Sequence, residues 1–451
     1  MSQARYHLAG FQSPTVRLRS IGVAIVAFVS ALALNPRLSS VLIVLGAAAI
    51  YTWNRRVASQ IPLVRRIAVL GFAIRITVAL LQTRYGLFFP NADANIYALR
   101  GHQLVTYGYT QSHAWGFITL GQFGIISLNA LSAWIPGSPS IELTTSLFAA
   151  AASQLAIIIT YDAFYQDKAW RRLTTGLPAE IRYWQITMAV LALSPSLAIW
   201  GSQDLKEPFL MLGMALIAKG FTRSPRRDKP TLPAILIGLS IVLLFRPYIG
   251  ALVAAVVAAI TLIRGNSSRR PRVRVVAIIA ALYLGIRTIG PHLVGLSLTQ
   301  QRVNSIQAGG NSVSTTNLHG SLLSKTALVQ LLFNPVPWQP PGSFAATAGY
   351  LEGLCIGVGL ILCLATFLKS NNRMRNLSSL SNYAIITFTT VDIVYSLGLT
   401  NAGTIAREKA PALLLIAPIL TIAMLSRMKQ NRGFRAPGIY KGPHSMRKSL
   451  L

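Results

Sequence analysis

Long apolar runs alternate with short polar segments along almost the whole chain. The runs lie at about 21–35, 38–53, 67–83, 141–161, 184–200, 207–222, 232–246, 248–263, 275–290, 345–368, 381–399 and 411–426. Because a helix of roughly 20 apolar residues crosses a bilayer, this pattern predicts an all-α fold, a polytopic transmembrane helix bundle of about 12 spans. Several runs are shorter, so these spans could be tilted, re-entrant or merged with a neighbour, above all within 21–53 and 232–263.

Basic residues are concentrated in every second gap between these runs. Of the 42 Lys and Arg residues, 31 lie in the segments 1–20, 54–66, 162–183, 219–231, 264–274, 369–375 and 427–451. The positive-inside rule therefore puts these segments, and both termini, in the cytoplasm of a multi-pass protein of the cell membrane. The net charge of +31 is spread over many short loops, which indicates contact with anionic lipid of the bilayer and argues against nucleic acid as a partner.

The resulting organisation has three parts. Residues 1–20 form a cytoplasmic N-terminal segment, 21–426 a transmembrane domain, and 427–451 a basic cytoplasmic tail. The long gaps that carry few Lys or Arg residues, 84–140 and 291–344, are predicted to be extracytoplasmic loops. With 53% hydrophobic and 12% charged residues, a soluble domain of this length would lack the polar surface to cover itself. Because the two long loops are predicted to lie outside, we expect the protein to act on the outer face of the membrane.

The first predicted outer loop contains an acid ahead of a short helical pattern. Asp93 follows the Pro90 turn and could cap the helix that ANIYALRGHQL predicts. Alternatively, the helical spacing puts Asp93, Tyr97 and Arg100 on one face, where an acid, a phenol and a guanidinium meet. His102 and several aromatic residues follow, and such groups suit a sugar as well as a membrane interface.

A second charged feature is the short turn SQDLKEP between two apolar runs. Its charges are Asp204, Lys206 and Glu207, followed by Pro208. In one interpretation Asp204 or Glu207 simply favours the start of the next helix, with Pro208 in its first turn. In the other, Lys206 offers a point charge to a phosphate while an acid organises the acceptor or a metal.

Further cations lie at the predicted outer ends of later spans. Arg246 precedes Tyr248 in LLFRPYIG, and Arg407 lies in NAGTIAREKAP. We expect Asp93, the 204–207 turn, Arg246 and Arg407 to converge on one outward-facing site. Arginine binds phosphate oxygens in pairs, so such a site favours a lipid-linked phosphate or diphosphate; contact with anionic headgroups is the alternative.

Two ionisable residues fall inside predicted spans. Arg75 and Asp392 are costly at membrane depth, and they either pair with each other or mark a functional path.

The sequence also resembles known membrane proteins of glycan assembly. The opening of the first outer loop, NADANIY, is similar to the acid-containing loop of GT-C class glycosyltransferases, which use polyprenyl-phosphate-linked sugars. The ordered set SQDLKEP, LLFRPYIG, AGGNS, NPVPWQ with LEGL, and NAGTIAREKAP resembles bacterial membrane proteins of surface-polysaccharide assembly over roughly 85–425. By this resemblance Asp93 is the catalytic base on the acceptor hydroxyl. The loop has DA where the family has DD or DE, so no cofactor is assigned and a divalent metal is left open.

The sequence thus favours a membrane glycosyltransferase that moves a sugar from a polyprenyl-(di)phosphate carrier to a cell-surface glycan. The predicted catalytic residue is Asp93, and the predicted substrate-binding residues are Tyr97, Arg100, His102, Asp204, Lys206, Glu207, Arg246, Tyr248 and Arg407. One alternative is an enzyme like an O-antigen polymerase, in which paired arginines and an acid handle two lipid-linked glycans. The other is a non-enzymatic transporter or flippase, for which broken helices with buried charges would speak.

Overall fold

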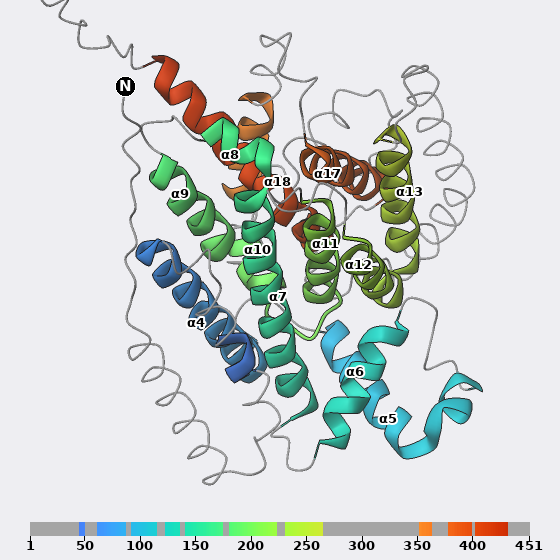
Figure 1. Ribbon diagram of the computed structural model, residues 1–451. Helices are drawn as coiled ribbons and strands as arrows, with labels where there is room; N and C mark the ends of the chain where they lie inside the picture. The colour runs from blue at the N-terminus through green and yellow to red at the C-terminus, as the bar shows by residue number, and fades with distance from the viewer. Residues whose placement is uncertain are drawn as a thin grey trace, which may run out of the picture.

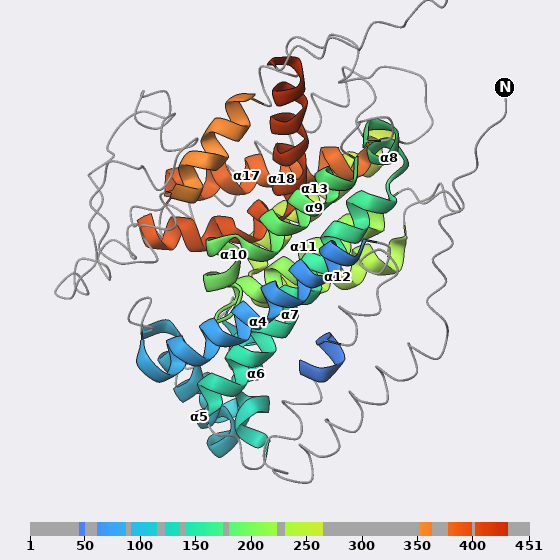
Figure 2. The same ribbon diagram turned by 90° about the vertical axis from the view of Figure 1, so that its left-hand side faces the viewer.

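The computed structural model describes residues 45–49, 61–86, 92–114, 122–135, 140–174, 180–222, 231–264, 351–362, 378–398 and 402–431. Within these ranges every regular element is an α-helix and no strand occurs, so the predicted all-α fold is confirmed. The helices are α4 (Pro62–Tyr85), α5 (Ala92–Ala114), α6 (Phe123–Trp134), α7 (Ile141–Gln166), α8 (Lys168–Thr174), α9 (Glu180–Leu193), α10 (Pro195–Trp200), α11 (Glu207–Phe221), α12 (Leu232–Phe245), α13 (Pro247–Arg264), α17 (Ser379–Gly398) and α18 (Ala402–Asn431). Figures 1 and 2 show them from two sides.

Most described helices coincide with apolar runs of the sequence. Helices α4, α7, α11, α12, α13, α17 and α18 each cover a predicted span, and helix Leu351–Leu362 lies within another. Helix α18 continues to Asn431, so the predicted tail begins as helix. The runs 21–35 and 275–290, the loop 291–344 and the segment 1–20 lie outside the described residues.

The helix lengths do not establish twelve membrane spans. Among the described residues, only α7 is both long and apolar enough to cross a membrane, and most of its apolar window is buried inside the protein. Helices α6, α12 and Leu351–Leu362 and the apolar part of α13 are shorter than 18 residues. The finding fits an all-α protein, and the number of spans stays a prediction.

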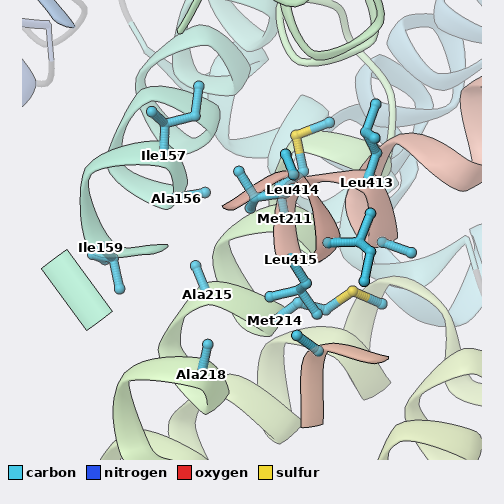
Figure 3. Close-up of a cluster of buried hydrophobic side chains, with 14 of the residues drawn as sticks. Ala156, Ile157, Ile159, Met211, Met214, Ala215, Ala218, Leu413, Leu414 and Leu415 are labelled. Carbon is cyan, nitrogen blue, oxygen red and sulfur yellow. The ribbon is translucent and has the colours of Figure 1, made fainter. Parts of the chain in front are cut away.

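The core lies where α7, α11 and α18 meet. Helix α7 contributes small residues such as Ala156, which allow the helix backbones to approach closely. Met211 and Met214 of α11 and Leu414 of α18 fill the space opposite it, as Figure 3 shows. This packing holds α11 and α18, which are far apart in sequence, in fixed positions relative to each other.

Helices α11 and α12 pack against each other through facing glycines. A Cβ atom added to Gly213 would lie 2.8 Å from the carbonyl oxygen of Gly238, and one added to Gly238 would lie 2.5 Å from that of Gly213. Neither position has room for a side chain. This contact holds the middle of α12 against α11, and Arg246 directly follows the last residue of α12.

One predicted span, 184–200, is broken into α9 and α10. Pro195 has no backbone N–H, so it cannot donate to the carbonyl of Leu191, and Ser194 caps the new helix by accepting from the N–H of Leu197 at 3.2 Å. The N–H of Ser196 donates to Glu352 at 2.8 Å instead of continuing α9. The Ser-Pro pair is a helix-start signal, and it divides what the apolar pattern predicted to be a single span.

The buried Arg75 of α4 donates hydrogen bonds to backbone carbonyl oxygens at the end of α9, next to this break. Its guanidinium donates to the carbonyl oxygens of Ala192 at 2.8 Å and Leu191 at 3.4 Å, and to the Ser153 hydroxyl at 2.9 Å. The last carbonyls of a helix lack partners within the helix and attract cations. Arg75 therefore does not pair with Asp392, which instead forms an ion pair with Lys409.

Candidate functional site

Five charged side chains from four separate chain segments meet at the end of the bundle where α11 begins. We call Asp93, Glu207, Arg246, Arg407 and Glu408 the charged cluster. Asp93 lies in the first turn of α5, Glu207 in the first turn of α11, Arg246 between α12 and α13, and the last two near the start of α18. Figure 1 shows α5 and α6 beside this end of α11 and α12.

Arg407 connects three acids of the cluster. It donates to Asp93 at 2.7 Å, although the two residues are 314 positions apart in sequence. It also lies 3.5 Å from the Glu207 carboxylate and 3.4 Å from that of Glu408. The sequence predicted that Asp93, Glu207 and Arg407 lie together, and these contacts bring them together.

Arg246 connects the same two glutamates from the other side. Its Nη2 lies 2.9 Å from the Glu207 carboxylate and also pairs with Glu408, and its Nη1 bonds to the Tyr248 hydroxyl. The side chains of Arg246, Glu207 and Glu408 are all buried. Each glutamate is therefore shared by two guanidiniums, an arrangement that holds their carboxylates close together.

Two carboxylate oxygens of the cluster have no hydrogen-bond partner among the described residues. These are Oε2 of Glu207 and Oε2 of Glu408, and both are buried. A buried acceptor without a partner costs about 1 to 3 kcal/mol, so most such atoms in proteins are satisfied. The two oxygens are thus candidates for contact with a donor that is not among the described residues.

Lys206 and Tyr97 border the cluster. The Lys206 ammonium lies 5.5 Å from the centre of the Tyr97 ring, within the range of a cation–π contact. Tyr97 is buried, and burial, followed by the nearby Asp93, raises the pKa of its phenol. The phenol therefore keeps its proton at neutral pH and can donate a hydrogen bond.

Asp93 is held in its charged form. Burial alone would raise its pKa, but the guanidinium of Arg407, aided by Lys206 and Arg246, outweighs burial and lowers it. The helix α5 begins at Ala92, and the Asp93 carboxylate binds Arg407. Asp93 thus lies in the first turn of α5 and also pairs with Arg407.

Asp204 faces a different set of groups. Its carboxyl oxygen accepts from the Asn129 amide at 2.8 Å, and the Thr145 hydroxyl lies 3.2 Å from the Asn129 side-chain oxygen and 2.9 Å from the Ser132 hydroxyl. Burial raises the pKa of Asp204 well above its usual range. Asp204 therefore lies in a network of otherwise uncharged side chains between α6, α7 and the turn before α11, where burial disfavours its charged form.

Two other predicted site residues lie apart from the charged cluster. Arg100 bonds to Gln122, ahead of α6, and His102 is exposed on α5 without a side-chain contact to the cluster. The predicted helical face is thus split: Asp93 and Tyr97 reach the cluster, whereas Arg100 does not join it. Their assigned roles in substrate binding stay predictions.

Glu408 is the cluster residue that the sequence-based set of site residues omitted. It lies between Arg407 and Lys409, and this run of alternating charges near a helix start was the available signal. Sequence alone does not reveal that Arg246 also pairs with it, 162 positions away.

No group of three or more His, Cys, Asp or Glu side chains in the described ranges is arranged to hold a metal ion.

Comparison with known proteins gives no relative: no family model matches the sequence, and no curated protein or solved structure matches it either. The resemblance to GT-C class enzymes therefore rests on the quoted sequence motifs alone.

Proposed function

We propose that this protein is an integral membrane glycosyltransferase. It transfers a sugar from a polyprenyl-(di)phosphate carrier to a cell-surface glycan on the extracytoplasmic face. The observation that carries the proposal is the charged cluster itself, in which α5, α11, the α12–α13 junction and α18 each contribute a group to one place. Convergence of distant charged residues is typical of a binding or catalytic site.

Exposed apolar side chains support a membrane location. Leu232, Leu236 and Ile237 of α12 and Leu70 of α4 are each more than half exposed. Large apolar side chains in contact with water are unfavourable when they form a continuous face, whereas lipid solvates them. With the positive-inside pattern, this supports a bundle whose charged cluster lies at the outer surface.

The chemistry would use Asp93 at the acceptor. The oxygen of Asp93 that does not bind Arg407 can accept a hydrogen bond from the acceptor hydroxyl. That hydroxyl oxygen attacks the anomeric carbon, the bond from this carbon to the carrier phosphate breaks, and the electron pair leaves with the phosphate. Because the pKa of Asp93 is lowered, the proton moves to its carboxylate only as the new bond makes the hydroxyl acidic.

The test is transfer by purified protein in liposomes that contain a panel of radiolabelled polyprenyl-phosphate sugars and lipid-linked acceptor glycans. Asp93→Asn should reduce transfer at least about a hundredfold at equal protein amount, because it removes the base. Glu180→Gln, a change to an acid at the other end of the bundle, is the control and should transfer normally. Wild-type transfer by Asp93→Asn would overturn the role of Asp93.

Orientation is tested separately by cysteine labelling of intact cells, in a background where Cys355 and Cys363 are serine. Tyr109→Cys, exposed on α5, should react with a membrane-impermeant reagent, and Arg171→Cys, exposed on α8, should not. The reverse pattern would overturn the predicted topology.

Two observations favour related alternatives. Arg246 and Arg407 share Glu207 and Glu408, and such paired arginines fit an enzyme like an O-antigen polymerase, whose product would be a ladder of repeat units. The break between α9 and α10, with Arg75 and Glu352 beside it, fits a transporter. Movement of a lipid-linked glycan across the liposome bilayer without any transfer would favour the transporter.

A further inference from the structure

The two arginines of the charged cluster are already engaged with carboxylates. Arg246 binds Glu207 and Glu408, and Arg407 binds Asp93 and lies close to the same two glutamates. A phosphate that bound either guanidinium would have to displace a carboxylate or lie beside one. The arginines are therefore poorly placed as the primary contact of an anionic ligand.

Lys206 is different, because its ammonium has no carboxylate within 4 Å among the described residues. Its described contact is with the face of the Tyr97 ring, which steadies the side chain without neutralising the charge. The side chain is partly exposed, whereas the neighbouring Glu207 is buried. Lys206 is thus a cation at the accessible edge of the cluster.

The net charge of the cluster shows why Lys206 matters for the binding of an anion. Three carboxylates face two guanidiniums, so the charged cluster carries one net negative charge, and the Lys206 ammonium brings the total to zero. Without that ammonium the cluster would repel an anion. With it, an anion can bind on the side where the positive charge has no partner.

We infer that Lys206 is the residue that binds the phosphate group of the lipid-linked substrate, and that Arg246 and Arg407 are positioning residues that hold the three carboxylates. The inference rests on the proposed function and names the phosphate contact within that site. A lysine ammonium is a suitable phosphate ligand because it acts as a point charge with three donors.

The groups that face Lys206 also make binding depend on pH. Burial lowers the pKa of Lys206 to about 7, and Arg246 and Arg407 lower it as well, while Glu207 and Glu408 oppose them. Asp93 and the protonated phenol of Tyr97 complete its surroundings. A bound phosphate stabilises the ammonium, so binding takes up a proton, and the affinity should fall as the pH rises through 7 and above.

The experiment titrates a polyprenyl monophosphate into the full chain in phosphatidylcholine nanodiscs at pH 6.0 and 8.5. Lys206→Gln should weaken binding at pH 6.0 at least about tenfold, because a charge-assisted hydrogen bond is lost. Lys206→Arg should bind as the wild type does at pH 6.0 and lose less affinity at pH 8.5. Phosphate itself titrates near pH 6, so the comparison with Lys206→Arg isolates the lysine.

Matched controls distinguish the polyprenyl phosphate from other phosphate ligands. They also distinguish a specific loss of binding from misfolding of the variant. Lys219→Gln removes a lysine from the other end of α11, where it pairs with Asp162 and Gln166, and should bind normally. Inorganic phosphate and phosphatidylglycerol are titrated in parallel, and each should bind more weakly than the polyprenyl phosphate. Gel filtration and thermal unfolding verify that each variant is folded.

The outcomes separate the two proposals. If the wild type binds and transfers but Lys206→Gln binds equally well, the inference is wrong and the proposed function stands. If phosphatidylglycerol or inorganic phosphate binds as tightly as the polyprenyl phosphate, the site recognises a general anion and the inference is also wrong. If the wild type does not bind the polyprenyl phosphate, both proposals fail.

Discussion

Two buried arginine sites of this protein differ in what surrounds the guanidinium. Arg75 is surrounded by uncharged oxygens, which come from the carbonyls of Leu191 and Ala192 and the hydroxyl of Ser153. Arg246 is surrounded by carboxylates that it shares with Arg407. The first arrangement completes a broken helix, whereas the second joins four chain segments through charges.

The difference indicates which site the fold itself requires. The end of α9 needs donors, and Arg75 supplies them, so its contacts have a structural explanation. The charged cluster lies at the end of the bundle and leaves two buried carboxylate oxygens without described partners. Beside it, Lys206 forms no ion pair with any described residue. Buried ion pairs seldom add net stability, so a network of this kind is better explained by function.

The largest expected effect is loss of stability on Arg75→Met. It leaves the Leu191 and Ala192 carbonyls unsatisfied in the interior, which should lower the free energy of unfolding by about 2 to 5 kcal/mol. Thermal unfolding in detergent measures the change. Arg182→Met, at an exposed position of α9, is the control and should unfold like the wild type. An unchanged unfolding temperature for Arg75→Met would show that the fold does not depend on Arg75, and the proposed difference between the two arginine sites would be wrong.

A smaller loss of stability with a greater loss of function is expected for Arg246→Lys. A lysine is a point charge and cannot hold Glu207, Glu408 and Tyr248 with one planar group. We expect the free energy of unfolding to fall by about 1 to 3 kcal/mol and transfer to fall at least about tenfold, because the carboxylates lose their fixed positions. Turnover that survives while stability falls as far as in Arg75→Met would assign Arg246 a structural role as well.

Asp204→Asn tests the uncharged network beside the charged cluster. Burial raises the pKa of Asp204 in the folded protein, so folding disfavours its charged form, at a cost that grows as the pH rises above 3.8. The variant should therefore unfold at the same temperature as the wild type near pH 4 and at a higher temperature at pH 7.5. A lower unfolding temperature at pH 7.5 would mean that Asp204 is charged and paired.

The smallest expected effect belongs to Arg100→Gln. Arg100 bonds to Gln122 and does not join the charged cluster, so transfer and polyprenyl phosphate binding should each change less than about twofold. Assays on the purified variant at matched protein amount measure both. A tenfold loss would show that the substrate extends along α5 and that the cluster is only part of the site.

Local sequence signals account for the helices and for several residues of the site. Glu207 and Pro208 mark the start of α11, as the turn before them predicted, and the apolar runs give the positions of α4, α7 and α12. The break before α10 was not predicted, although Ser194 followed by Pro195 is a local helix-start signal. These features depend on neighbours in the chain, which is why one sequence is enough to find them.

From the amino-acid sequence alone, the chain is predicted to be helical, and Asp93, Glu207, Arg246 and Arg407 are predicted to converge. The pairing of the charges is visible only in the folded protein: Asp93 with Arg407, Glu408 with Arg246, Asp392 with Lys409, and Asp204 with an uncharged amide. Ionic contacts act over a few ångströms, so they depend on how distant helices pack. That packing is set by residues such as Gly213 and Gly238, whose effect appears only when the helices meet.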